Sequence, residues 1–462
     1  MVRESGRFFV AATAGAIILR LIFVFRFSSV TTDSFIYGDI AKNWLLHGIY
    51  GISYAGEVLP TYIRLPGYPV FLAAVFAIFG MEHYRAVLVV QMFVDVGTCF
   101  LIANLARRVV SARASRIAFL LAALCPFTAN YAAAALTETW EIFFTALSLN
   151  FAVAGFESHD ARKTGAWVGC GLATACAILL RPDGGILLAA IELFLAWALV
   201  EKVRTNMRVL NPVRAALVVG IISLAPLVPW TLRNLHAMHR FQPLVPRYAN
   251  EESEFVPAGF NRWVRTWIAD YTSVEGIYWP IPGVAVDPKQ LPERAFDSAK
   301  QRRETLQLID EYNSALHISP DLDAKFAVLA SERVGRSPLR YYGWLPALRI
   351  ADMWLRPRTE MLPPDSRWWE FNDDPKWSAL AVGLGLIGFF YVATSLVGLL
   401  RGRAFRCVGL LTTFVVARSL FLGTLENPEP RYTLECFPVV IVFAAAAFLA
   451  RRRVGDSPPE LR

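Results

Sequence analysis

The sequence predicts an all-α membrane protein that crosses the bilayer many times. Of its 462 residues, 55% are hydrophobic and only 18% are charged. The apolar residues gather in blocks of roughly 18–22, the length at which a helix spans the hydrocarbon core of a bilayer. A single soluble core rarely exceeds about 250–300 residues, and glycine and proline occur in ordinary numbers. A soluble multidomain enzyme, a disordered chain and a collagen-like chain are therefore excluded.

Ten apolar blocks qualify as transmembrane helices. In chain order they cover residues 8–28, 86–106, 115–134, 138–155, 164–180, 185–200, 214–232, 378–399, 407–424 and 433–450. An eleventh stretch, 66–80, begins Pro-Gly-Tyr-Pro and is only about 15 residues long, which suits a short interfacial or re-entrant helix. The first block is longer than the apolar part of a signal peptide, and no convincing cleavage site follows it. We therefore expect an uncleaved anchor.

The distribution of charge predicts the orientation. If 66–80 does not cross, the segments on the side of the N-terminus hold 19 Lys and Arg and six Asp and Glu, whereas the opposite short loops hold few basic residues. An excess of Lys and Arg marks the cytoplasmic side, so both termini are expected there. The net charge of +8 is then a topological signal and not the basic surface of a nucleic-acid-binding protein.

Three segments follow from this topology. Residues 1–232 form an N-terminal transmembrane module with its first external loop at 29–85, residues 233–377 form an external segment, and residues 378–462 form a C-terminal transmembrane module with a cytoplasmic tail. Within the external segment, helices are expected over 292–316, 321–334 and 340–355, the last one on the membrane surface. Eight of the 13 tryptophans lie in this segment. They are expected to form an interfacial belt and a small core, with platforms for sugar rings as the alternative.

Charged and metal-binding residue types inside the apolar blocks carry little further signal. All six cysteines lie in or at the ends of predicted spans, and the histidines form no zinc motif. Arg20 and Asp95 lie at similar depth in the first two spans, which favours a buried structural ion pair over a proton pathway. Glu192 has no partner that the sequence identifies.

The first external loop begins with a short helix along the membrane. Asp33 and Tyr37 are four residues apart and share a face that Trp44 continues, whereas Asp39 points elsewhere. Asp33 lies at the N-terminal edge of this helix, where it has either a functional role or the plain role of a helix cap.

Two groups of residues in this loop resemble a known family signature. They are Asp33, Tyr37, Ile40 and Ala41, followed by Arg64, Pro66, Gly67, Tyr68 and Pro69. The pattern resembles the first loop of GT-C glycosyltransferases, in particular the branch of the dolichyl-phosphate-mannose protein mannosyltransferases and the lipid A aminoarabinose transferase. Later segments resemble further motifs of that family in the same order: Leu136-Thr137-Glu138-Thr139, Leu180-Arg181-Pro182-Asp183, Pro229-Trp230-x-x-Arg233-Asn234 and Pro430-Arg431-Tyr432.

The resemblance implies a GT-C fold and a reaction on the outer face of the cell inner membrane. A monosaccharide, hexose or pentose, would pass with inversion from a polyprenyl-phosphate donor to an envelope acceptor, which is a lipid, a glycan or a protein. Such a transfer needs a carboxylate that accepts the proton of the attacking hydroxyl and cations that neutralise the departing phosphate. The general base expected from the resemblance is Asp33. The expected ligands of the donor phosphate are Arg64, Arg233, Arg431 and Tyr432. The expected ligands of the sugar or acceptor are Tyr37, Tyr68, Glu138, Arg181 and Asp183.

Several alternatives stay open. An arginine at the end of a span is often only an interfacial anchor, although the outer ends of spans are normally poor in arginine. Glu138 could simply stabilise the start of the following helix. Ser34 stands where many relatives carry a second acidic residue, so no paired carboxylate supports a metal site; no obligate cofactor is expected, and a divalent cation stays possible. The rival functions are a transporter or flippase of lipid-linked glycans, an en bloc oligosaccharide transferase and a non-catalytic scaffold.

Overall fold

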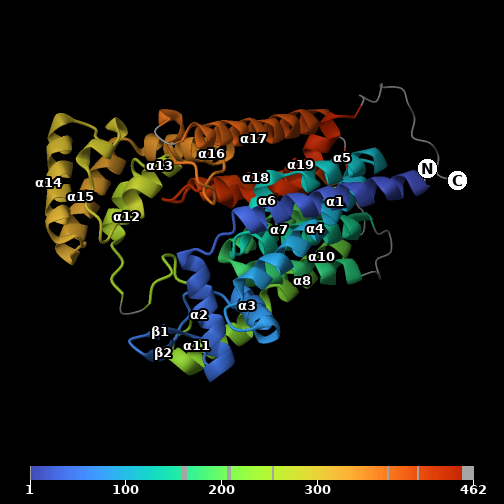
Figure 1. Cartoon of the computed structure of the whole chain (residues 1–462), viewed down its shortest axis with the longest axis horizontal. Helices are drawn as coiled ribbons and strands as arrows, with labels where there is room; N and C mark the ends of the chain where they lie inside the picture. Colours follow the sequence, from blue (N-terminus) through green and yellow to red (C-terminus); the bar gives the residue numbers. More distant parts are fainter. Residues whose placement is uncertain are drawn as a thin grey trace.

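The computed structural model describes residues 2–157, 164–204, 210–251, 254–371, 374–402 and 405–449, and most of the residues in these ranges are helical. Long helices run side by side along the longest axis of the molecule, and shorter elements cover one end of this bundle (Figure 1). The helices long and apolar enough to cross a membrane are α1 (Val2–Arg26), α4 (Tyr84–Val109), α7 (Glu138–Glu157), α9 (Gly185–Arg204), α10 (Leu210–Leu224) continued by α11 (Leu227–Met238), α17 (Pro375–Arg401), and α19 (Phe437–Ala447) preceded by the 3-10 turn η7 (Pro430–Cys436).

The predicted class, an all-α protein with many membrane spans, is confirmed. Within the described ranges, seven helices pass the test of length and apolar composition, or eight if a bent pair counts as one span. The shorter apolar helices α8 (Gly165–Leu180) and α18 (Val408–Gly423) coincide with two more of the predicted blocks. The stretch expected to be a short helix forms α3 (Gly67–Phe79). The total of ten crossings stays a prediction.

One predicted span is not a single straight helix. Residues 115–134 divide into α5 (Ala112–Ala123) and α6 (Pro126–Ala132), which meet at an angle of 53°. The break has a local cause, because Pro126 carries no backbone N–H with which to continue the hydrogen-bond ladder of α5 and is well suited to begin a new helix. The predicted span at 115–134 is therefore a bent pair of helices, which can count as one span. The bend directs the short α6 towards the start of α7, where residues expected in the site lie.

The first loop folds against the end of the bundle. It contains α2 (Thr32–His47), the antiparallel strands β1 (Gly51–Tyr54) and β2 (Glu57–Pro60), and then α3. In Figure 1, α2 runs steeply across the direction of α1. The N-cap of α2 is Thr31, whose backbone N–H donates to Ser34 Oγ at 3.0 Å. The capping alternative for Asp33 is therefore wrong, and the Asp33 side chain is available for other contacts.

The segment between α11 and α17 has a core of its own. Its helices and turns are α12 (Ala258–Arg265), α13 (Tyr271–Ser273), η2 (Val274–Tyr278), η3 (Pro288–Gln290), η4 (Glu293–Ala295), α14 (Ala299–Ala315), α15 (Pro320–Arg336), η5 (Arg340–Trp344), α16 (Leu345–Leu355) and η6 (Trp368–Glu370). Trp263 and Trp267 are fully buried in this core with Phe326, whereas Trp344 is 62% exposed. The tryptophans thus divide between a core and a surface.

The start of the first of these helices differs from the prediction. We expected it to begin at residue 292, but only the short turn η4 forms there and α14 begins at Ala299. The reason is local, because the Ser298 side chain accepts a hydrogen bond from the backbone N–H of Gln301 at 3.2 Å and so caps α14.

A buried ion pair ties the first spans together. Arg20 on α1 and Asp95 on α4 lie 2.7 Å apart, with side chains that are 0% and 2% exposed. The same nitrogen, Arg20 Nη2, also donates to the carbonyl of Ala122 on α5 at 3.1 Å. The expected structural ion pair is therefore present, and it joins three helices in the interior of the bundle.

Candidate active site

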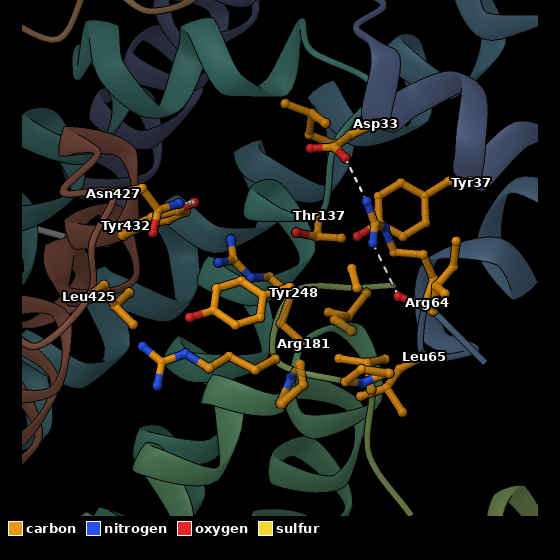
Figure 2. Close-up of a pocket in the computed structure, with 18 of the residues that line it drawn as sticks. Asp33, Tyr37, Arg64, Leu65, Thr137, Arg181, Tyr248, Leu425, Asn427 and Tyr432 are labelled. Carbon is orange, nitrogen blue, oxygen red and sulfur yellow. Dashed lines mark hydrogen bonds and ion pairs between the residues drawn. The ribbon is translucent and has the colours of Figure 1, made fainter. Parts of the chain in front are cut away.

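A cavity of about 400 Å³ lies at the end of the bundle that the first loop covers. Figure 2 shows Asp33, Tyr37 and Arg64 on one side and Leu425, Asn427 and Tyr432 on the opposite side, with Thr137, Arg181 and Tyr248 between them. These residues come from α2, the loop before α3, the connection from α6 to α7, the end of α8, the chain after α11 and the chain after α18. The cavity therefore brings together segments from most of the chain.

Asp33 and Arg64 form an ion pair in the wall of this cavity. Arg64 Nη2 lies 2.8 Å from Asp33 Oδ1, and the side chains are 17% and 41% exposed. The guanidinium also lies over the ring of Tyr37, 5.4 Å from its centre. Burial raises the pKa of Tyr37 to about 12, so its hydroxyl keeps its proton. The arrangement places a partly exposed carboxylate, a guanidinium and a phenol hydroxyl side by side.

The first residue of α7, Glu138, is shared by two arginines. Its Oε1 lies 3.5 Å from Arg431 Nη1 and 3.8 Å from Arg181 Nη1. Its side chain is only 2% exposed, and Oε2 has no hydrogen-bond partner among the described residues. A buried carboxylate oxygen without a partner is costly, so this atom is suited to accept a hydrogen bond from a molecule in the cavity.

Arg431 and Arg181 are held in place by further carboxylates and by one aromatic ring. Arg431 Nε lies 2.6 Å from Glu429 Oε2, and Arg181 Nε lies 3.3 Å from Asp183 Oδ1. The two guanidinium groups lie 5.3 and 4.8 Å from the centre of the Tyr432 ring. Since the fork of an arginine has five donors, both groups retain donors for an anionic ligand.

Three of the residues expected in the site do not line the cavity. Tyr68 is fully buried and donates to Gln91 Oε1 at 2.7 Å. Asp183 lies behind Arg181 and accepts a hydrogen bond from Arg418 at 3.0 Å. Arg233 donates to the backbone carbonyl of Thr61 at 2.7 Å and lies against the ring of Trp230. In this geometry the three residues support the walls of the cavity.

The sequence interpretation missed a second ion pair in the cavity. Arg247 Nη2 lies 2.8 Å from Glu426 Oε2, and burial raises the pKa of the neighbouring Tyr248 to about 12. Nothing in the local sequence around residues 245–249 indicates a site. By contrast, Glu426 and Glu429 are two carboxylates directly before Arg431 in a short segment between apolar blocks, and this concentration of charge could have identified them.

The described residues do not provide a set of protein ligands for a metal ion. Across the ranges of the chain that the structure covers, no three or more His, Cys, Asp or Glu residues are placed to hold one. Asp33 is paired with an arginine instead of a second carboxylate.

Comparison of sequences links part of the chain to one family. The family described as dolichyl-phosphate-mannose-protein mannosyltransferase matches residues 64–230. This region contains Arg64, Glu138 and Arg181 of the cavity. No curated protein sequence matches the chain.

Comparison of structures finds similar membrane proteins. The oligosaccharyltransferase AglB from Archaeoglobus fulgidus, in complex with an inhibitory peptide and a dolichol-phosphate, matches with a TM-score of 0.50 at 16% identity over 95% of this chain and 50% of that one. Its apo form matches with a TM-score of 0.53 at 15% identity over 96% and 50%. ArnT from Cupriavidus metallidurans bound to undecaprenyl phosphate matches with a TM-score of 0.39 at 14% identity over 95% and 77%. The chain thus spans about half the length of the AglB structures and shares their fold.

Proposed function

We propose that the chain is a GT-C membrane glycosyltransferase that transfers a monosaccharide from a polyprenyl-phosphate donor to a membrane or envelope acceptor, and the family match over residues 64–230 and the fold shared with AglB support this. This proposal rests on the composition of the cavity. Its lining contains Asp33 together with three arginines and two tyrosines of the motif segments, namely Arg64, Arg181, Arg431, Tyr37 and Tyr432. A carboxylate beside several guanidinium groups suits a reaction that removes a proton from a hydroxyl and releases a phosphate. The AglB structure was solved with a dolichol-phosphate, which is a lipid phosphate of the proposed class.

In the proposed reaction Asp33 is the general base. The acceptor hydroxyl oxygen forms a bond to the anomeric carbon, its proton passes to Asp33, and the bond between that carbon and the phosphate oxygen breaks. The bonding pair leaves with the phosphate, so the anomeric configuration inverts. Arg64 and Arg431 are the proposed phosphate ligands, with Tyr432 beside them. Tyr37, Glu138 and Arg181 are the proposed ligands of the sugar or the acceptor.

Arg233, which the sequence placed among the phosphate ligands, is the least favoured of them. Its guanidinium donates to the carbonyls of Tyr50 and Thr61. It would have to give up these hydrogen bonds in order to reach a phosphate in the cavity.

The cavity is proposed to open on the outer face of the inner membrane. The support is the excess of basic residues in the loops at the other end of the bundle, which the positive-inside rule assigns to the cytoplasm. With this orientation the donor lipid keeps its chain in the bilayer while its phosphate reaches Arg64 and Arg431.

The proposal is tested by comparing products with and without Asp33. Lipids and glycans of the envelope are analysed by mass spectrometry in cells that carry the wild-type chain, Asp33→Asn or no chain. The sugar adduct should disappear in the last two. Asp39→Asn is the matched control, because Asp39 lies on the same helix but accepts a hydrogen bond from Ser53 at 2.8 Å outside the cavity lining. Full transfer by a correctly inserted Asp33→Asn protein would refute the role of Asp33.

En bloc transfer of an oligosaccharide is the second candidate, because the fold is shared with AglB. Mass spectrometry separates the two, since one sugar residue or a whole oligosaccharide is added to the acceptor. A flippase, which the sequence left open, would move a labelled lipid across the bilayer and return it chemically unchanged.

A further inference from the structure

The helix α16 presents an apolar face that the rest of the described chain leaves open. The residues of this face are spaced by three or four positions, so they share one side of the helix. They are Trp344, Ala347, Ala351 and Leu355, preceded by Tyr342, and all five are exposed. We call these five residues the α16 surface. A contiguous apolar surface marks contact with a protein partner or with a membrane.

Another face of α16 fixes its direction. The helix lies beside α17 and α18 at the end of the bundle that faces the external segment (Figure 1). Trp354 Nε1 donates to Ser419 Oγ at 3.0 Å, and a Cβ on Gly423 would lie 3.0 Å from Ile350 Cδ1. Residues 350 and 354 thus meet residues 423 and 419 in reverse order, so α16 runs antiparallel to α18 and along the bundle.

The length of α18 gives the depth of this contact in a bilayer. α18 has 16 residues and rises about 24 Å, which is less than the ~30 Å of the hydrocarbon core. As a predicted span that starts at the inner boundary of this core, α18 ends about 6 Å inside the outer boundary. Trp344 lies six residues before Ile350, or about 9 Å further out. It therefore reaches the level of the lipid headgroups.

The chain after α16 gives a second measure of depth. A Cβ on Gly385 of α17 would lie 3.0 Å from Pro357 Cγ, and Gly385 is ten residues, or about 15 Å, from the outer end of this helix. The 27 residues of α17 rise about 40 Å, so at most about 10 Å of a spanning α17 projects from the outer side of the hydrocarbon core. Pro357 therefore lies at the depth of the hydrocarbon. The chain beyond it is shielded from lipid, since Arg358 is 2% exposed and both carboxylate oxygens of Glu360 are buried.

The side chains that face outwards on α18 continue the α16 surface. Val416 and Leu420 are 49% and 60% exposed, and in a spanning helix such side chains contact lipid. Tryptophan and tyrosine are enriched where the bilayer meets water, which is the level found for Trp344. Leu355 lies deeper, next to the hydrocarbon. Lipid therefore fits the α16 surface better than a protein partner does.

We propose that the α16 surface inserts into the outer leaflet, with Trp344 among the headgroups and Leu355 in the hydrocarbon, and so holds the external segment on the membrane. The helix can transmit this hold, because the buried Arg349 donates to the carbonyls of Ile268 at 2.8 Å and of Gly423 at 3.1 Å. One guanidinium thus joins α16 to the external segment and to α18. The proposal depends on the membrane spans and not on the reaction proposed above.

The test is power-saturation electron paramagnetic resonance of spin labels on the full chain in lipid nanodiscs. Trp344→Cys is compared with Leu420→Cys on α18 and with Val328→Cys on α15, which is 60% exposed in the external segment. Cys176 and Cys407 are replaced by serine, because the other four cysteines are buried. Oxygen concentrates in lipid, whereas a polar nickel chelate stays in water. The label at residue 344 should collide more with oxygen than with nickel, as at residue 420, and the label at residue 328 should show the reverse.

The depth of the helix supplies an independent readout. Leu355→Cys should give a higher ratio of oxygen to nickel collisions than Trp344→Cys, because residue 355 lies about 16 Å further along α16. Equal ratios, or a label at residue 344 that collides mainly with nickel, would overturn the proposal. A label shielded from both reagents would also overturn it and would show that protein covers this surface. If Trp344→Cys does not fold, Ala347→Cys on the same face takes its place.

Discussion

At the scale of single residues, the arginines of this protein divide by what their donors contact. Arg233 donates hydrogen bonds to backbone carbonyls of the first loop. Arg431 instead forms ion pairs with the side chains of Glu429 and Glu138 at the edge of the cavity. Backbone carbonyls cannot exchange partners without local unfolding. Carboxylate partners can share a guanidinium with an incoming anion.

This difference gives opposite expectations for two conservative substitutions. Arg431→Lys should lower the transfer rate about 10- to 100-fold with little loss of stability, because lysine lacks the planar fork that serves several anions at once. Arg233→Lys should lower the melting temperature and leave the KM for the donor unchanged. Thermal unfolding in detergent and steady-state kinetics measure the two effects. A raised donor KM in Arg233→Lys without loss of stability would restore the role that the sequence predicted.

Glu360 should also make stability depend on pH. Its pKa is raised in the folded state to about 7, while in the unfolded chain it is close to that of an ordinary glutamate. At pH values between these two pKa values, the folded protein keeps the Glu360 proton that the unfolded chain has lost. Glu360 therefore contributes to stability at low pH, and this contribution is lost as the pH rises to about 7. The full difference is up to about 3 kcal/mol.

Thermal unfolding of wild type and Glu360→Gln checks this expectation. The melting temperature of the variant relative to the wild type should rise between pH 5 and 8. Parallel curves would show that the carboxyl group is not in the buried environment described above.

At the scale of elements, helix packing explains why the first-loop motif has a glycine at residue 67. Gly67 begins α3 where this helix meets the end of α8, and an added Cβ would lie 2.6 Å from the carbonyl oxygen of Leu179. The close approach lies next to Leu180, which precedes Arg181 of the cavity. The motif Pro66-Gly67-Tyr68-Pro69 therefore fixes the contact between two elements, whereas the residues before it, Ile63, Arg64 and Leu65, line the cavity.

A methyl group at residue 67 should separate these elements. Gly67→Ala is expected to destabilise the protein by about 1–3 kcal/mol, as overpacking does, and to lower transfer by displacing Arg181. Gly165→Ala is the control, because a Cβ there meets no atom within 4 Å. Equal stability of the two variants, measured by thermal unfolding, would exclude the packing explanation.

At the scale of the whole molecule, local and non-local features differ in how well the sequence predicts them. Most of the spans follow from apolar length, and the structure brings Asp33, Tyr37, Arg64, Glu138 and Arg181, which the motifs predict as site residues, together in the lining of one cavity. Arg247 could not be predicted, because its segment reaches the cavity only through tertiary packing. The same reason explains Tyr68 and Arg233. Both occupy the positions expected from the family motifs, but Tyr68 contacts Gln91, and Arg233 contacts backbone carbonyls of the first loop.

The ion pair between α1 and α4 gives an expectation for the bundle as a unit. Asp95→Asn leaves Arg20 buried without a compensating charge, and we expect a loss of about 3–5 kcal/mol. Replacing both Arg20 and Asp95 by leucine should restore most of that stability. A single variant as stable as the wild type in thermal unfolding would show that the pair is not essential to the bundle.

The bend between α5 and α6 shortens the rise of the chain that leads to the cavity. The 12 residues of α5 rise only about 18 Å at 1.5 Å per residue, well short of the ~30 Å hydrocarbon core, whereas α4 has 26 residues and rises about 39 Å. The seven residues of α6 turn away at 53° and add little to this rise, and the chain that lines the cavity at Leu136, Thr137 and Glu138 follows them. We therefore expect the cavity to lie below the level that its neighbours reach. For the proposed transfer, such a recess would favour a slender or membrane-bound acceptor over the rigid surface of a large folded protein.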